Sequence, residues 1–571
     1  TLAGFIIRNS AAVSDVRVAS PNGHSDYNLA GAGIAAVNKS HLTIRDNIIE
    51  DADCGGIIVD TLTGADDSFQ ATIARNIFRN NNMAGLVIDT RGGSGTYEVL
   101  IQDNVFGENG GTGLQIDARS YGTARLEVNQ ATFEDNGGDG LRIDEVSSDA
   151  LADGHAQILV NDVAALHNAG NGIHIERGAI VTGEGVASLT LSNIDASSND
   201  SNGIYVGTGA RSGRGEATVL IDSVVANNNR HTEGIYIVQG AVVSEGDASL
   251  EISNVEANGN HWDGVWVVTG AQAMSGSAVA SFQNISGSDN EDYSALWIDT
   301  GAKCVNGTAA TYLQGITAFN NGDAGLYIGR GAAVSQGEAY LTVAHVSAVS
   351  NHDYGVQIHN GAIAGTGQAQ VALYYLTCNE NGESGIWVGR GAVVTDGYAH
   401  LAMSGVEAND NMWDGVRVGT GAKCVTGTAE TDIHGITAFN NGDTGLYIGR
   451  GAAVSQGEAY LTVANVSAVS NANCGIWFDN TAAKSVSDDA YLTLTDVNAL
   501  SNGSHGIEFT RYAVDSASGE ASLDFDGVTS SYNDLYGIYF ANGMFRAGAV
   551  TDVAQWNVTT VGNGSGGVYN P

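Results

Sequence analysis

The chain has 571 residues and a net charge of −40, from 63 acidic against 23 basic side chains, and 43% of its residues are hydrophobic. This charge argues against nucleic acid as a partner, because an acidic surface repels phosphates, and the apolar content excludes a disordered chain. No run of 18 apolar residues occurs, so we expect no membrane-spanning segment. Because the chain begins at Thr1 without an initiator Met or a signal-peptide layout, we expect a processed or truncated piece of a longer protein.

Residues 1–170 contain the first copies of a repeat, whose marker is a Gly followed by apolar–any–apolar. Toward the N-terminus the markers are 27–29 residues apart, and the step falls to 23 between Gly33 and Gly56. Apolar residues alternate with period two inside each unit, which is typical of strands with one buried face. Three short strands in each unit, with no helical stretch between them, predict a three-sided coil in which like strands stack.

We expect regular coils over residues 171–475, because the markers from Gly264 to Gly475 are 30 or 31 residues apart. The segments 301–351 and 421–471 differ at seven positions in fifty-one, at an offset of 120 residues. Nine consecutive units, starting at Gly203, add Gly-Ala six and seven residues after the marker and a Gly at twelve. We expect this insert to form a stacked, hairpin-like flange on one corner.

Residues 476–571 continue the markers to Gly567 without the insert, so we predict one continuous domain of about 19 coils. Ten residues before most markers stands a type that tolerates a left-handed backbone, and Tyr375 is the exception. Four residues before them stands Asn, for example Asn381 and Asn411. Stacking would place these amides ~4.8 Å apart. Each could then donate a hydrogen bond to the next coil and accept one from the last.

The segments RDNIIEDADCGGIIV (45–59) and ARNIFRNNNMAGLVI (74–88) resemble the coils of the pectate-lyase-like superfamily, with adhesin-like repeats. The resemblance covers essentially the whole chain. It implies an all-β fold, a single right-handed parallel β-helix with three sides. It implies no single function, because this fold serves lyases, hydrolases, epimerases, phage tailspikes and adhesins.

The second residue after each marker lies between two inward residues, so we expect it to face outward. In the enzymes that the chain resembles, this strand forms the floor of the saccharide groove. Three hypotheses stay open: the aromatic residues stack on one another for stability, they contact a subunit or partner, or they stack on sugar rings. The aromatic members of this stripe are Tyr205, Tyr236, Trp266, Trp297, Tyr327, Trp387, Tyr447 and Trp477.

Acidic residues also recur at one repeat position. Asp323, Asp353 and Glu383 stand two residues before successive markers, so their carboxylates are expected ~5 Å apart. Carboxylates at that distance repel each other unless a cation bridges them, so calcium is a possible cofactor and solvated turns are the alternative. Arg417 is the only basic residue in the central stripe and Asp414 is near it, which makes this pair the candidate for catalysis.

The near-uniform coils favour a surface that repeats over a single pocket. We therefore expect an extracellular or cell-surface protein that is structural or adhesive and not an enzyme. It would be a surface-layer, sheath or filament subunit, or an adhesin stalk, that associates with itself or binds a cell-surface glycan. The alternative is a polysaccharide-binding or polysaccharide-degrading β-helix protein, lyase-like or hydrolase-like, that uses the aromatic stripe.

Overall fold

The computed structural model describes residues 1–8, 17–18, 27–28, 32–37, 41–62, 68–91, 95–150, 153–479, 481–545 and 550–570. Every regular element in these ranges is a β-strand. The strands form an all-β parallel solenoid with about 17 turns, slightly fewer than the 19 expected. The chain divides into two compact units, Thr1–Ile285 and Ser286–Pro571.

In the first unit, strands pair in parallel with the equivalent strand of the next turn. Among the described residues, the pair β3–β4 is antiparallel. The strands of this unit, the last of which belongs mostly to it, are β1 (Leu2–Ala3), β2 (Ile6–Arg8), β3 (Arg17–Val18), β4 (Tyr27–Asn28), β5 (Ile34–Val37), β6 (His41–Arg45), β7 (Ile48–Glu50), β8 (Ile57–Leu62), β9 (Phe69–Ala74), β10 (Ile77–Arg79), β11 (Leu86–Arg91), β12 (Thr96–Gln102), β13 (Val105–Gly107), β14 (Leu114–Ser120), β15 (Thr123–Glu134), β16 (Leu141–Ser148), β17 (Gly154–Leu166), β18 (Ile173–Asp195), β19 (Ile204–Val225), β20 (Ile235–Glu256) and β21 (Val265–Ser288).

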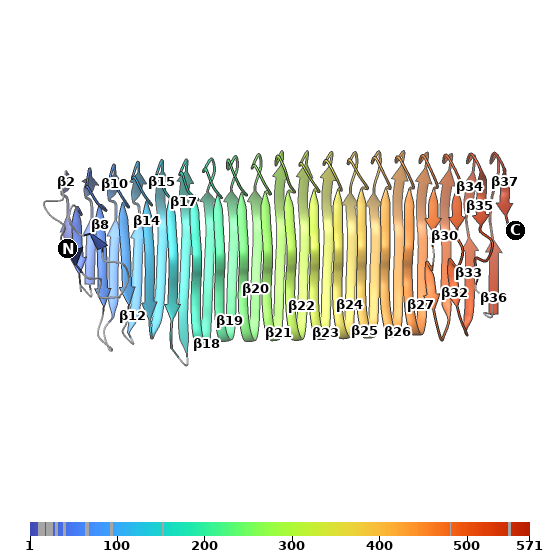
Figure 1. The fold of residues 1–571 in the computed structure, drawn as a ribbon, viewed down its shortest axis with the longest axis horizontal. Coiled ribbons are helices and arrows are strands. Elements are labelled where there is room, and N and C mark those ends of the chain that lie inside the picture. Colours follow the sequence, from blue (N-terminus) through green and yellow to red (C-terminus); the bar gives the residue numbers. More distant parts are fainter. Residues whose placement is uncertain are drawn as a thin grey trace. The chain divides into compact units, whose positions relative to one another are not determined.

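In the second unit, long strands follow one another side by side in chain order from β22 to β27, and shorter strands follow them (Figure 1). The strands of this unit are β22 (Leu296–Phe319), β23 (Leu326–Val349), β24 (Val356–Thr377), β25 (Ile386–Glu407), β26 (Val416–Phe439), β27 (Leu446–Val469), β28 (Ile476–Phe478), β29 (Ala483–Ser485), β30 (Ala490–Leu500), β31 (Ile507–Phe509), β32 (Val514–Ser516), β33 (Glu520–Asp526), β34 (Thr529–Ser531), β35 (Tyr536–Phe540), β36 (Val550–Trp556) and β37 (Gly566–Tyr569).

The core lies inside the coils, where the apolar residues of the alternating pattern meet. In β23, Leu326 and Ile328 have no exposed surface, while Tyr327 between them is half-buried and faces outward. Ile328 pairs in register with Ile358 of the next coil, so like residues stack in columns. Burying such a side chain contributes about 1.5–3 kcal/mol, and each coil repeats the contribution. The predicted superposition of equivalent residues is therefore confirmed.

The predicted column of asparagine amides is also confirmed, here for the second unit. The Nδ2 of Asn381 donates to Oδ1 of Asn411 at 3.0 Å, and Nδ2 of Asn351 donates to Oδ1 of Asn381 at 3.1 Å. The backbone N–H of each residue donates to the same acceptor, as from Asn381 to Asn411 at 3.0 Å. All three side chains are 1–2% exposed. The column thus satisfies turn groups that have no access to water.

One corner of each coil has the left-handed backbone that the sequence predicts. Gly405 has φ 64°, and Asn465 has φ 52° at the equivalent position. Tyr375, which was expected to break the pattern, has φ 55° and keeps the same bend. Its ring stacks on His345 with centroids 5.0 Å apart, and 62% of the residue is exposed. The bend is therefore imposed by the stacked neighbours, at a cost of ~1–2 kcal/mol for a residue with a Cβ.

The expected flange consists of bends stacked in parallel. In β23 the chain runs through the tip sequence Ser335–Gly337 as one strand, and Gln336 and Gly337 pair in parallel with Thr366 and Gly367. Gly337 has φ 126°. A Cβ at Gly337 would meet the carbonyl oxygen of Gly307 at 2.0 Å, which explains the Gly at this place in each insert.

Candidate functional site

In the first unit, the outward stripe forms a column of touching rings. Parallel pairing places Tyr205 opposite Tyr236, with ring centroids 5.6 Å apart. Tyr236 and Trp266 follow at 4.8 Å, and His174 lies 4.7 Å from Tyr205 on the other side. These rings are half-buried, because each is covered by its neighbours along the column. These contacts agree with the hypothesis that the aromatic residues stack on one another.

In the second unit, Trp297, Tyr327, His359 and Trp387 form one run of touching rings, and Tyr447 and Trp477 form another. Trp297 and Tyr327 stack face to face, with centroids 3.7 Å apart and planes 17° apart. Trp387 packs against His359 at 4.7 Å, and Tyr447 meets Trp477 edge to face at 5.4 Å. A sugar ring stacks on an open aromatic face, and the faces that Trp297 and Tyr327 turn to each other are closed.

Polar atoms of two rings in this stripe donate to neighbouring carboxylates, whereas the buried Nε1 of Trp477 has no hydrogen-bond partner among the described residues. The indole Nε1 of Trp297 donates to Asp299 at 2.8 Å, and the hydroxyl of Tyr447 donates to Asp479 at 2.8 Å. Burial and this hydrogen bond raise the pKa of Tyr447 to about 12, so the phenol remains a donor at neutral pH. The hydrogen bonds fix both rings and leave the carboxylates at the edge of the stripe.

The catalytic candidates Arg417 and Asp414 lie together. The guanidinium Nη1 is 2.9 Å from Oδ2 of Asp414, and its carbon atom Cζ lies 4.2 Å above the ring centre of Tyr447. Asp414 is 1% exposed and accepts the backbone N–H of Thr444 at 3.1 Å. Burial raises the pKa of Asp414, and Arg417 opposes this effect. Because arginine keeps its proton in proteins, Arg417 supplies a positive charge and cannot act as a general base.

The three predicted calcium ligands stand in successive coils, as expected. The backbone N–H of Asp353 donates to the carbonyl of Asp323 at 3.3 Å, and that of Glu383 donates to the carbonyl of Asp353 at 2.9 Å. Burial, and then the charge of Asp353, raise the pKa of Asp323 to about 6. Near neutral pH, a proton on Asp323 therefore competes with any cation that the stack could bind, and calcium binding stays a prediction.

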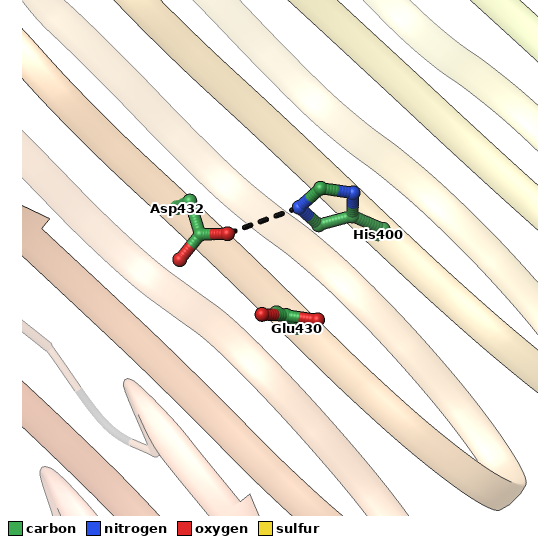
Figure 2. Close-up of side chains that lie close together, drawn as sticks. All are labelled: His400, Glu430 and Asp432. Atoms are coloured by element: carbon green, nitrogen blue, oxygen red, sulfur yellow. Dashed lines mark hydrogen bonds and ion pairs between the residues drawn. The ribbon is translucent and has the colours of Figure 1, made fainter.

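A group that the sequence analysis missed lies on another strand face. His400, Glu430 and Asp432 each offer a ligand atom within 4.8 Å of the other two (Figure 2). Among the described residues, these three form the one group of three or more His, Cys, Asp or Glu side chains whose ligand atoms all lie this close together. The sequence contained a signal, because Glu430 and Asp432 are two of the seven positions at which 421–471 departs from 301–351.

The comparisons with known proteins address the fold and not the site. Residues 4–124 and 32–155 match the family model described as a right-handed β-helix region. No curated protein and no solved structure matches the chain. No helix suited to crossing a membrane was found in the described ranges. The family match over residues 4–155 and the coiled parallel strands show that the chain is a right-handed parallel β-helix protein, and both support the resemblance to the pectate-lyase-like superfamily.

Proposed function

We propose that the protein is a non-enzymatic, structural or adhesive β-solenoid that acts outside the cell or at its surface. The observation that carries the proposal is the stripe where related enzymes have their saccharide groove. In this chain its rings pack on one another, as Trp297 packs on Tyr327 at 3.7 Å. Its Arg417 is paired with buried Asp414. A stripe built in this way stabilises the coil, and its Arg417 keeps its proton and supplies no general base.

The repeat supports the same proposal. The segments 301–351 and 421–471 are nearly identical in sequence, so the second unit presents the same side chains at regular intervals. Such a surface suits a partner that also repeats, either a second copy of this chain or a cell-surface glycan. The net charge of −40 favours solubility and cations over anionic partners.

The test is the association state of the full chain. Sedimentation velocity and negative-stain imaging over a hundredfold range of concentration are expected to show ordered polymers. A chain that stays monomeric throughout, and that also binds neither cells nor glycans, would contradict the proposal. The variant Trp387→Ala with Trp477→Ala asks whether the stripe is the contact surface, and Tyr340→Ala with Tyr460→Ala is the control, because these two tyrosines lie outside the stripe.

A polysaccharide-binding or polysaccharide-degrading function is the second candidate, and one part of the stripe favours it. Around Trp387 and Tyr447, aromatic rings alternate with the charge of Arg417 and the carboxylate of Asp479. This mixture could hold a sugar by ring contact and hydrogen bonds together. Glycan-array binding and release of reducing ends or unsaturated uronates from polysaccharides would support it. If the double variant Trp387→Ala with Trp477→Ala binds the glycan array as well as wild type, the stripe is not the glycan-binding surface.

A further inference from the structure

A histidine and two carboxylates meet on the outward face of β25 and β26 (Figure 2). His400 of β25 pairs in register with Glu430 of β26, and Asp432 follows two residues later on the same face. The imidazole Nε2 lies 3.1 Å from Oδ2 of Asp432. All three side chains are half-buried, so a small ion reaches them from solvent without any rearrangement of the coil.

Glu430 is held in place by a further hydrogen bond. The hydroxyl of Tyr398 donates to Oε2 of Glu430 at 2.5 Å. Burial, and then this bond, raise the pKa of Tyr398, so the phenol remains a donor. Partners of this kind orient ligands in metal sites, because they fix which oxygen points toward the ion. The carboxylate of Glu430 offers a ligand atom within 4.8 Å of those of His400 and Asp432.

The neighbouring coils are built differently at these positions. In β23, Tyr340 donates to Glu338 of its own strand at 2.8 Å, and Tyr460 of β27 bonds Glu458 of its own strand in the same way. In β25 the equivalent pair is Tyr398 and His400, and the tyrosine bonds across to the next coil. The tyrosine–carboxylate pair is replaced in β24 by Gln368 and Gln370, and in β25 and β26 by pairs that contain His400 and Glu430.

A second segment of the chain shows the same coil without the two carboxylates. The segment 301–351 is a copy of 421–471, and the copy has Ala310 where the site has Glu430, and Tyr312 where it has Asp432. Because the rest of the two segments is almost unchanged, the carboxylates were not required by the fold of the coil. Two of the seven differences fall on the two residues that face His400.

We propose that His400, Glu430 and Asp432 bind one divalent transition-metal ion, and that zinc is the ion best suited to them. An imidazole nitrogen with two carboxylates suits zinc, whereas calcium and magnesium prefer oxygen ligands alone. Two ligands at ~2.0–2.1 Å from a tetrahedral ion are about 3.3 Å apart, close to the 3.1 Å between His400 and Asp432. Three protein ligands leave one position for water or a partner's side chain.

The test is zinc titration of the metal-free full chain by isothermal calorimetry, repeated with calcium and with magnesium. We expect one saturable zinc site per chain and at least a hundredfold weaker binding of the other two ions. Glu430→Ala and Asp432→Tyr introduce the residues of the natural copy, so both should fold, and unchanged melting in chelator checks this. Each should weaken zinc binding by a hundredfold or more, as should His400→Ala.

Glu458→Ala is the matched control, because it removes a carboxylate from the same face of the next coil. It should leave the zinc affinity unchanged. Absence of a saturable site in the wild-type chain would overturn the proposal. So would equal losses in Glu458→Ala and Glu430→Ala, since the acidic surface as a whole would then account for the binding. Calcium binding as tight as zinc binding would overturn the choice of ion.

Discussion

The asparagine column makes the sharpest prediction about stability, and Asn471 tests it. Its side chain accepts hydrogen bonds from the backbone N–H and the Nδ2 of Asn441 at 3.1 and 2.9 Å. Its own Nδ2 donates to the carbonyl of Ala438 at 3.2 Å and to Oδ1 of Asn502 at 3.0 Å. Asn471 is 1% exposed, so water cannot replace these bonds in the folded coil. Asn471→Ala therefore removes four buried hydrogen bonds.

The size of the destabilisation in Asn471→Ala follows from these hydrogen bonds. A buried hydrogen bond contributes about 0.5–1.5 kcal/mol, and a buried group left without a partner costs about 1–3 kcal/mol. We expect Asn471→Ala to lower the local free energy of opening by roughly 3–5 kcal/mol, since the backbone N–H of Asn441 also loses its acceptor. The matched control is Asn473→Ala in the same turn, where a half-buried side chain donates to Asp443 at 2.9 Å. We expect it to cost about 1 kcal/mol or less.

The assay is amide hydrogen exchange, because a solenoid opens locally and has no single free energy of unfolding. In Asn471→Ala, exchange at the backbone amide of Asn441 should accelerate at least a hundredfold, since ~1.4 kcal/mol corresponds to a factor of ten. In Asn473→Ala the same amide should change by less than tenfold. Equal protection of this amide in both variants would refute the argument that the column holds the turns.

Three further measurements test separate parts of the account. Tyr375→Asn should raise the melting temperature, because Asn tolerates φ 55° better than Tyr, and a lower melting temperature would show that the stack on His345 outweighs the strain. Burial raises the pKa of Glu233 to about 7, so the folded chain binds this proton more tightly and its stability falls as pH rises from about 4.5 to 7. Glu233→Gln should therefore melt higher than wild type at pH 8 and equally at pH 4, and a gain that persists at pH 4 would exclude titration as the cause. Calcium should raise the melting temperature if Asp323, Asp353 and Glu383 bind it, with reversal by chelator, and Asp353→Asn should abolish the rise; a wild-type chain without any rise has no such site.

The repeating features of the fold could be predicted from the sequence, because they depend on spacing alone. A period of two within each strand and of about 30 between markers is enough to superimpose Asn381 on Asn411 and Trp297 on Tyr327. Tyr375 shows where residue type misleads. The backbone at this corner is set by the coils above and below, so a residue with poor intrinsic preference still takes φ 55°.

The site could be predicted less well, because it depends on side-chain directions between coils. Spacing placed Arg417 near Asp414, but it could not reveal that the guanidinium covers Tyr447 or that Asp414 is buried. His400 lies 30 and 32 residues before Glu430 and Asp432, so the register between coils was needed to bring them together. The differences between the two nearly identical segments were the available signal.

The most direct test of the central claim, that residue i lies over residue i+30 on the same face, is a cysteine cross-link in the second unit. Thr342 of β23 pairs with Ala372 of β24, and both are half-buried on the outward face. Adjacent parallel strands are ~4.8 Å apart, within the range that a disulfide spans. Thr342→Cys with Ala372→Cys should form a disulfide on mild oxidation, whereas Thr342→Cys with Leu373→Cys should not, because Leu373 points into the core. Equal cross-linking of the two pairs, or preference for the offset pair, would contradict the register on which the stripe, the asparagine column and the zinc site all depend.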